Sequence, residues 1–130
     1  MIHLDTNILI NLVTAYPPQV AVVRVWLQEG RILTASAVAW SEFLNGPHTL
    51  TQKDAVRGIP GGGIRPSDEA HAEQASRLFH QTGRRRGSHA DCMIAAAAIC
   101  SREPVASRNI SGFERFVPYG LMLELVATVP

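Results

Sequence analysis

Three carboxylates stand where short apolar segments meet probable helix starts, and acids in such places can bind metal. Asp5 follows the apolar start of the chain, Glu42 lies in a mostly apolar helical segment, and Asp91 comes three residues after Ser88. The carboxyl ends of parallel strands gather along one edge of a sheet, so groups distant in sequence converge there. Three anions brought together repel one another and take up protons unless a cation neutralises them. A hard divalent ion such as Mg²⁺, which prefers oxygen ligands, is the natural partner.

Each carboxylate alone also has a purely structural interpretation. Asp5 can cap the helix that follows it, because its side chain can accept hydrogen bonds from the first backbone N–H groups. Asp91 can favour the positive end of its helix, a surface effect worth about 0.3 to 1 kcal/mol. Glu42 is harder to explain in this way, since a lone acid near a buried face usually has a partner or a cation. The three together favour a shared site.

A run of three arginines, residues 84–86, stands directly before the helix that carries Asp91. Arginine matches phosphate with a planar fork, and eleven of the twelve basic residues are arginines; a GC-rich genome would give the same preference. The run could hold a phosphate chain against a metal, or form a solvated turn. Arg108 and Asn109 follow a strand candidate and would lie on the same sheet edge, where Asn109 could bind a metal-bound water and Arg108 a phosphate.

Short apolar strand candidates alternate with helical patterns along the chain. We expect strands at residues 1–4, 31–35 and 104–107, with a last edge strand at 121–126. We expect helices at residues 8–13, 17–28, 37–44 and 67–80, and an almost wholly apolar one capped by Ser88. Residues 46–66 should form a loop with a short helix candidate at 51–56. This alternation predicts an α/β sandwich with a mainly parallel sheet.

Composition points to one globular domain, residues 1–130. The chain is 46% hydrophobic and 18% charged, with a net charge of +1. The longest uninterrupted apolar run, residues 92–100, is well below the roughly 18 residues that span a bilayer. The start of the chain lacks the pattern of a secretory signal. We therefore expect a cytoplasmic protein without a membrane association.

These segments resemble the PIN-domain ribonucleases, and within them the VapC toxins of toxin–antitoxin pairs. Residues 1–7 resemble the family's opening strand with its first metal-binding acid, residues 39–43 the segment with the second acid, and residues 90–96 the helix with the third. Residues 107–109, followed by Phe113, resemble the Thr-Arg-Asn stretch that ends in Asp-Phe. Where many relatives have this Asp, the chain has Gly112. Either Asn109 fills the fourth position weakly, or the site works with three carboxylates.

The resemblance implies a PIN-like α/β/α sandwich and an endoribonuclease, dependent on Mg²⁺ or Mn²⁺, that hydrolyses RNA as a toxin. Asp5 and Asp91 would bind the ion most directly, and Glu42 would complete the cluster or orient the attacking water. Thr6 and Asn109 would position water or phosphate. The RNA backbone would be bound by three arginines: Arg85, Arg86 and Arg108. The partners implied are a small VapB-type antitoxin that blocks the acidic site and a second copy in a homodimer.

Two other functions remain open from the sequence. A catalytically weak or silent PIN-like module that binds RNA or protein is favoured by Gly112. A phosphatase with Asp5 as its nucleophile is disfavoured, because position 7 is Asn where the common Asp-x-Asp motif needs an acid. The sequence does not fix the RNA, the cleavage position or the antitoxin.

Overall fold

A parallel sheet forms the centre of the molecule. The structure, a computed structural model, describes residues 1–14, 17–124 and 126. Five strands lie in the order β3-β2-β1-β4-β5, and every neighbouring pair is parallel. The strands are β1 (Ile2–Leu4), β2 (Leu33–Ser36), β3 (Ile64–Arg65), β4 (Val105–Ala106) and β5 (Leu123–Glu124). This sheet confirms the predicted α/β fold class.

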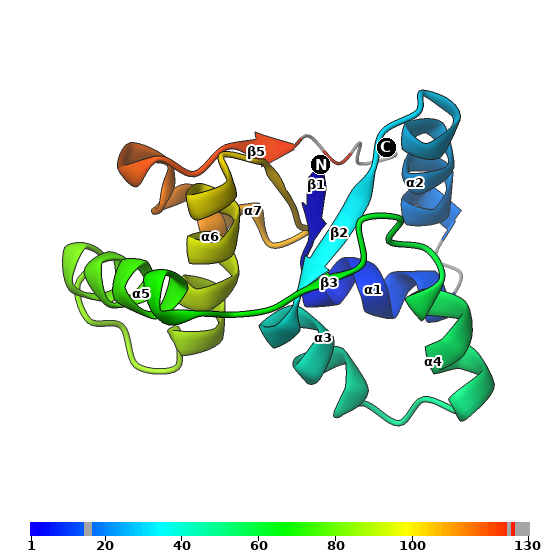
Figure 1. The fold of residues 1–130 in the computed structure, drawn as a ribbon, viewed down its shortest axis with the longest axis horizontal. Helices are drawn as coiled ribbons and strands as arrows, with labels where there is room; N and C mark the ends of the chain where they lie inside the picture. Colours follow the sequence, from blue (N-terminus) through cyan, green and yellow to red (C-terminus); the bar gives the residue numbers. More distant parts are fainter. Residues whose placement is uncertain (15–16, 125, 127–130) are drawn as a thin grey trace.

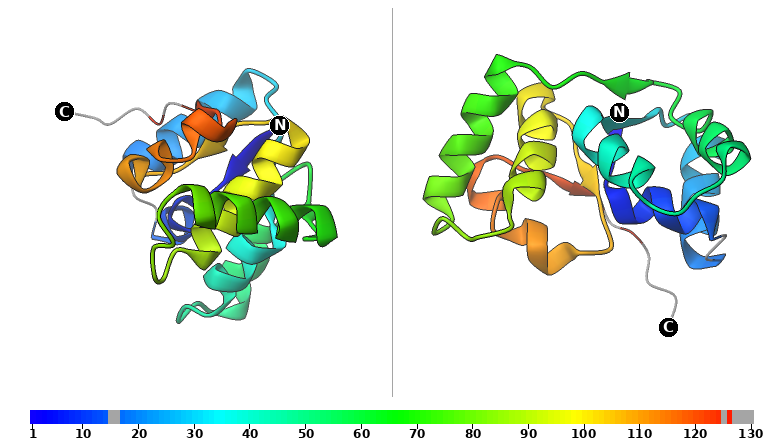
Figure 2. Two further views of the ribbon diagram at one scale, coloured as in Figure 1. Left: turned by 90° about the vertical axis from the view of Figure 1, so that its left-hand side faces the viewer. Right: turned by 90° about the horizontal axis from the view of Figure 1, so that it is seen from below.

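Helices cover both sides of the sheet and make the sandwich. Their bounds are α1 (Thr6–Val13), α2 (Pro17–Gln28), α3 (Ala37–Leu44), α4 (Leu50–Arg57), α5 (Glu69–Gln81), α6 (His89–Ser101), α7 (Ile110–Glu114) and the 3-10 helix η1 (Val117–Tyr119). Figure 1 shows α5 and α6 on one side of the strands and α1, α2 and α4 on the other, and the right-hand view in Figure 2 shows the same separation. No single helix among the described residues is long and apolar enough to cross a membrane; α1 and α2 pass that test only as a pair bent by 105°.

The register of the three central strands explains why polar side chains lie together at one edge of the sheet. His3 of β1 is level with Thr34 of β2 and with Val105 of β4. Two residues further on, Asp5 follows the end of β1, Ser36 is the last residue of β2, and Ser107 follows the end of β4. Parallel strands in this register therefore deliver three polar side chains to the same level of the same sheet edge.

Two of these polar residues also start helices. The Asp5 side chain accepts a 2.7 Å hydrogen bond from the Thr6 backbone N–H at the start of α1. Ser36 accepts from the Ala39 N–H, 3.2 Å away, at the start of α3. Because each cap satisfies a backbone group that would otherwise lack a partner, the chain passes from strand to helix with no intervening loop. Glu42, in the second turn of α3, is thereby brought above the sheet edge.

The structure differs from the sequence expectations at several places. Ser88 occupies the residue before α6, but its side chain makes no cap; it donates a 2.7 Å hydrogen bond to the Arg85 carbonyl instead. The segment 46–66, expected as a loop around one helix, also contains strand β3. The strand expected at 121–126 is observed only as β5, and Leu125 lies outside the described residues. These strands have two residues each, too few to show an alternating pattern.

Candidate functional site

Asp5 is the innermost acid of the sheet edge. Its side chain is buried, with 5% of its area exposed. One carboxylate oxygen, Oδ1, accepts from the Thr6 backbone N–H, and the other, Oδ2, accepts from the Ser107 hydroxyl at 2.7 Å. A buried carboxylate needs such donors, because burial removes its water. Both oxygens are thus held in fixed directions.

Ser107 is the centre of a small hydrogen-bond network. Its hydroxyl oxygen accepts from the Asn7 side-chain amide at 3.2 Å and from the Asn109 backbone N–H at 2.9 Å. With both lone pairs occupied, the single hydroxyl hydrogen is directed to Asp5. The Asn7 carbonyl oxygen in turn accepts from the Arg108 N–H at 3.2 Å. The loop after β4 is therefore fastened to the start of α1 around the Asp5 carboxylate.

Glu42 reaches the same edge from α3. Its Oε1 atom accepts a 2.8 Å hydrogen bond from the hydroxyl of Thr6. Thr6 follows Asp5 directly, so the backbone N–H of Thr6 binds one acid and its side chain binds the other. Thr6 therefore donates hydrogen bonds to the carboxylates of both Asp5 and Glu42.

Asp91 approaches from the first turn of α6. Its side chain is 32% exposed, and its Oδ2 atom lies 3.7 Å from Nη2 of Arg115, which immediately follows α7. Each of the three acids is thus held by a different donor. Asp5 has Ser107, Glu42 has Thr6, and Asp91 has the cation.

The three carboxylates act on one another electrostatically. Burial raises the pKa of Asp5 to about 6; the hydrogen bonds from Ser107 and Thr6 oppose this rise, and the negative charges of Asp91 and Glu42 add to it. Burial also raises the pKa of Asp91, where Arg115 and Arg85 oppose the rise and Glu42 adds to it. The acids predicted from the sequence are therefore neighbours in space.

These residues fit a hard divalent cation by chemistry. Carboxylate and hydroxyl oxygens are the ligands that Mg²⁺ prefers, and mutual repulsion of clustered acids is the condition that a cation relieves. The arrangement is open, however: among the described residues, no group of three or more His, Cys, Asp or Glu side chains is placed to hold one ion together. Binding of one ion by all three acids would require them to draw closer together.

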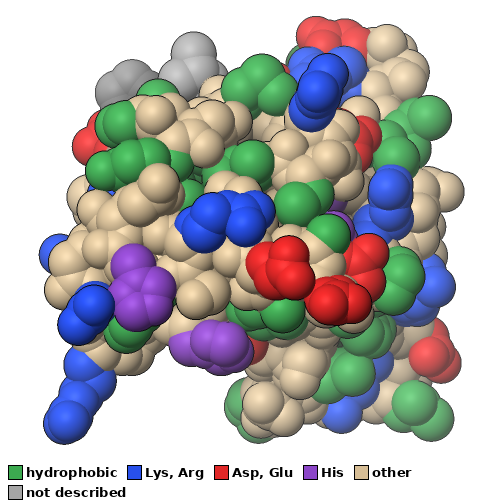
Figure 3. All heavy atoms as spheres, turned by 60° about the vertical axis from the view of Figure 1, so that its left-hand side comes forward, with side chains coloured by type: hydrophobic (Ala, Val, Ile, Leu, Met, Phe, Trp, Pro, Cys, Tyr) green, Lys and Arg blue, Asp and Glu red, His purple; other side chains and the backbone are tan. Residues whose placement is uncertain are grey.

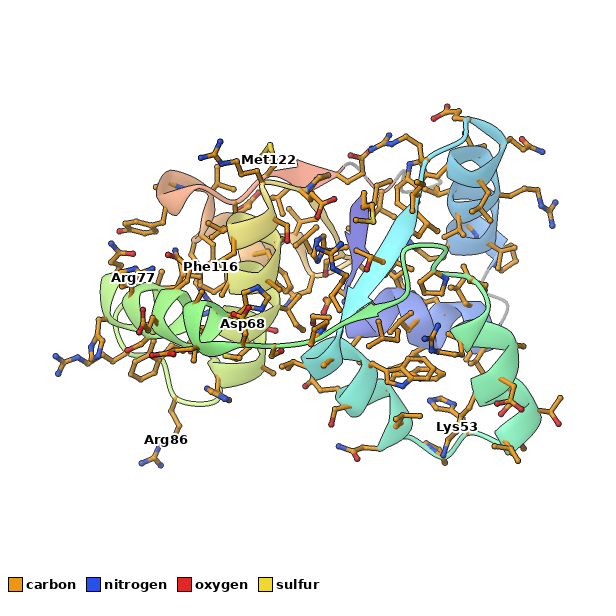
Figure 4. The ribbon with its side chains drawn as sticks, viewed as in Figure 1. Lys53, Asp68, Arg77, Arg86, Phe116 and Met122 are labelled. Atoms are coloured by element: carbon orange, nitrogen blue, oxygen red, sulfur yellow. The ribbon has the colours of Figure 1, made fainter. Side chains whose placement is uncertain are left out.

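The arginines predicted to bind phosphate lie in different directions. Arg85 is exposed and near enough to oppose the rise in the pKa of Asp91. Arg86 projects away from the body of the molecule (Figure 4). Arg84 donates from Nε to Nδ1 of His80, 3.0 Å away. Arg108 is exposed and donates from Nη1 to the Asn11 side chain at 3.5 Å.

Asn109 lies beside the site as a helix cap. Its side-chain oxygen accepts from the Gly112 backbone N–H at 3.2 Å, at the start of α7. Its backbone N–H reaches Asp5 only through Ser107. The structure therefore gives Asn109 a clear role in holding the loop after β4.

Two residues at the site were missed in the sequence. The direct bond between Ser107 and Asp5 could have been anticipated, because Ser107 follows a parallel strand next to β1. Arg115 gave no such signal, since it comes after α7, a five-residue helix that the sequence did not indicate.

Known proteins share this fold. The chain matches FitAB bound to an IR36 DNA fragment with a TM-score of 0.71 and 21% identity, over 95% of this chain and 94% of that one. It matches a toxin–antitoxin complex from Klebsiella pneumoniae with a TM-score of 0.71 and 23% identity, over 87% and 90%. For VapBC2 from Rickettsia felis, bound to DNA from its promoter, the values are 0.70, 21%, 95% and 98%. At these identities the likeness shows the fold alone. Curated proteins give no significant match.

A family model gives the stronger result. The model for the PIN domain matches residues 2–116, a span that starts with β1 and includes the acids of the sheet edge, the network around Ser107 and the whole of α7. Since this match extends over most of the 130 residues, the chain belongs to the PIN domain family.

Proposed function

We propose that this protein is a metal-dependent endoribonuclease that acts as the toxin of a toxin–antitoxin pair. The observation that carries the proposal is the convergence of Asp5, Glu42 and Asp91 at the carboxyl edge of a parallel sheet, within electrostatic reach of one another. The PIN family supports it, because the PIN domains of VapC-type toxins are nucleases. The solved relatives support it as well, being toxin–antitoxin complexes.

Asp5, Asp91 and Glu42 are the residues that would hold Mg²⁺ or Mn²⁺. Such an ion would polarise a water molecule and offset the negative charge that builds on the phosphate during hydrolysis. Ser107 and the Thr6 backbone hold the Asp5 carboxylate in place for this role. The Thr6 hydroxyl orients Glu42, which is placed to direct the attacking water. Asn109 contributes by fixing Ser107.

The RNA would be held by a few local cations. On the face in Figure 3, Lys and Arg side chains are scattered, whereas several Asp and Glu side chains lie together in a central group and others lie apart from it. We therefore assign backbone contacts to individual arginines near the acids: Arg85, Arg108 and, more peripherally, Arg86. The further partners proposed are a VapB-type antitoxin and a second copy of this chain. We also propose that residues 1–130 form one PIN domain acting in the cytoplasm.

Induced expression without an antitoxin tests the proposal. Wild-type protein should arrest growth, and sequencing of RNA 5′ ends should reveal new ends that appear on induction. Asp5→Asn should relieve the arrest while leaving the fold intact, because asparagine keeps an oxygen for the Thr6 cap. Asp54→Asn, on the surface of α4, is the matched control and should remain toxic.

The competing function is a silent PIN-like binding module. It is favoured by the open arrangement of the acids and by the lack of a side chain at position 112. Growth unaffected by abundant folded protein, together with unchanged RNA ends, would establish the module and exclude the nuclease. If Asp5→Asn remained fully toxic, Asp5 would serve only as the cap of α1 and not as a metal ligand.

A further inference from the structure

Arg115 is a partly buried cation, and two buried nitrogens of its guanidinium have unmet hydrogen-bonding capacity. Its side chain is 16% exposed, and neither Nε nor Nη2 has a hydrogen-bond partner among the described residues. Buried N–H groups without acceptors are costly, and more so on a charged group. A structure that keeps such a group must supply an acceptor in some state of the molecule.

The two unpaired atoms belong to the same edge of the guanidinium. Nε and Nη2 point their hydrogens in parallel, and this edge binds a carboxylate through two bonds at once. The nearest carboxylate given by the structure is that of Asp91, whose Oδ2 lies 3.7 Å from Nη2. A charge-assisted hydrogen bond is about 2.8 Å long. A movement of about 1 Å would therefore close the pair.

Asp91 is the partner that would move. The guanidinium carbon of Arg115 lies 4.6 Å from the centre of the Phe116 ring, which holds the cation from one face. Figure 4 places Phe116 next to α6, in the interior of that side of the molecule. Asp91, by contrast, is about a third exposed, so its side chain can rotate either toward Arg115 or toward Asp5 and Glu42.

We propose that Arg115 is the resident counter-ion of Asp91 and competes with the divalent ion for that carboxylate. The inference rests on the proposed function, because it needs the metal site. In the metal-free protein, Asp91 closes onto the Nε and Nη2 edge of Arg115. When the ion binds, Asp91 turns to the other two acids and the pair opens. Arg115 is thus a positioning residue that sets the metal affinity of the site.

The competition explains why the three acids are neighbours without forming a closed cluster. Asp91 lies near the Arg115 cation, which follows α7, while Asp5 and Glu42 are held by Ser107 and Thr6. Because the positive charge of Arg115 offsets part of the negative charge of the three acids, the site should bind its metal more weakly than three carboxylates without a nearby cation would.

Calorimetric titration of the RNA-free protein with MnCl₂ tests the proposal. In Arg115→Met, which keeps the apolar stem but loses the charge and the fork, the Kd for Mn²⁺ should fall on the order of tenfold. Arg115→Lys keeps the charge without the fork and should give a decrease of about threefold. Arg77→Met, on α5 (Figure 4), removes one arginine far from the acids and should leave the Kd unchanged. In an Asp91→Asn background, Arg115→Met should have no effect, because the shared carboxylate is gone.

The outcomes separate this inference from the proposed function. Equal Mn²⁺ affinity in wild type and both Arg115 variants overturns the competition and leaves the metal site standing. Weaker binding in folded variants overturns it too, since Arg115 would then support the metal. Absence of binding in every protein overturns the metal site and the competition together. If Arg115→Met does not fold, as judged by thermal unfolding, Arg115→Lys carries the test alone.

Discussion

The side-chain amide of Asn109 fills the space into which a side chain at position 112 would project. A Cβ added to Gly112 would overlap the amide nitrogen and lie 2.7 Å from Cγ and 2.9 Å from Oδ1 of Asn109. The same Oδ1 accepts the Gly112 N–H that starts α7. The helix cap and the missing acid at position 112 are therefore linked, because any side chain added at position 112 must displace the amide of Asn109.

This contact predicts that Gly112→Asp destabilises the protein. We expect the free energy of unfolding to fall by about 1 to 3 kcal/mol, because the added atoms overlap Asn109. The double variant Asn109→Gly/Gly112→Asp should recover most of the loss, since glycine is an acceptable cap and leaves the space open. Urea unfolding of the two variants and the wild type measures both effects. A single variant as stable as wild type would mean that Asn109 swings aside without cost.

The double variant also tests the fourth acidic position. An added carboxylate near a partly hydrated ion should tighten Mg²⁺ or Mn²⁺ binding by about 1 to 2 kcal/mol at the effective dielectric of a protein surface. Calorimetry on the antitoxin-free protein gives the affinity, with Asn109→Gly alone as the control. Unchanged affinity in a folded double variant would show that position 112 does not face the acids.

Removal of the Thr6 hydroxyl should impair catalysis more than stability. Thr6→Val keeps the shape of the side chain but frees Glu42 from its 2.8 Å hydrogen bond. We expect cleavage of a short RNA at saturating Mn²⁺ to slow by about 10- to 100-fold, the range for groups that orient metal ligands. Thr6→Ser, which retains the hydroxyl, should stay close to wild type. Equal rates for Thr6→Val and wild type would remove Thr6 from the catalytic arrangement.

The pKa of Asp5 predicts how stability changes with pH. This pKa is about 6 in the folded protein and 3.8 in an unperturbed aspartate, so the folded state binds the proton more tightly. The resulting stabilisation is fully present below about pH 3.8 and is lost as the pH rises through about 6. Metal-free Asp5→Asn should lack this loss and exceed the stability of wild type at pH 8 by on the order of 2 to 3 kcal/mol. Urea unfolding at several pH values gives the free energy of unfolding of each protein. A difference between the two proteins that stays constant from pH 4 to 8 would contradict the raised pKa of Asp5.

Arg85 and Arg86 should differ in their effect on RNA binding. Arg85 acts on Asp91, whereas Arg86 points outward. In an Asp5→Asn background, which prevents cleavage, Arg85→Ala should weaken binding and lower the salt slope by roughly 0.7, the value for one phosphate contact on a single strand. Arg86→Ala should change both quantities less. Fluorescence anisotropy at several salt concentrations measures both quantities. Salt slopes in both variants equal to that of the Asp5→Asn parent would show that residues 84–86 form a solvated turn.

The long-period features of this chain were readable from the sequence. Helices α2 and α5 carry apolar residues at helical spacing, α6 is almost wholly apolar, and Asp5 marks the change from strand to helix. The alternation of strands and helices predicts the parallel sheet, and the convergence of parallel strand ends at one edge predicts that Asp5, Glu42 and Asp91 lie together. The same rule placed Ser107 nearby without revealing that it binds Asp5.

The features that the sequence did not predict depend on contacts between residues that are distant in the chain. Strands β3 and β5 have two residues each, too few to show an alternating pattern in the sequence. They form because they pair with their neighbours in the sheet. The ion pair of Arg115 with Asp91 joins positions 24 residues apart, one in the first turn of α6 and the other directly after the five-residue helix α7. The order of donors around each acid depends on side-chain directions, which the spacing of residues does not specify.

The double role of Asp5 affects how related sequences should be interpreted. Because Asp5 caps α1 through the Thr6 N–H, a descendant that has lost its nuclease would still need a capping side chain at this position, and aspartate supplies one. Its presence in a relative therefore carries little information about activity. Glu42 and Asp91 cap no helix, so helix capping would not preserve them after the chemistry is lost. Those two positions are the ones to inspect when active members are to be told from inactive ones.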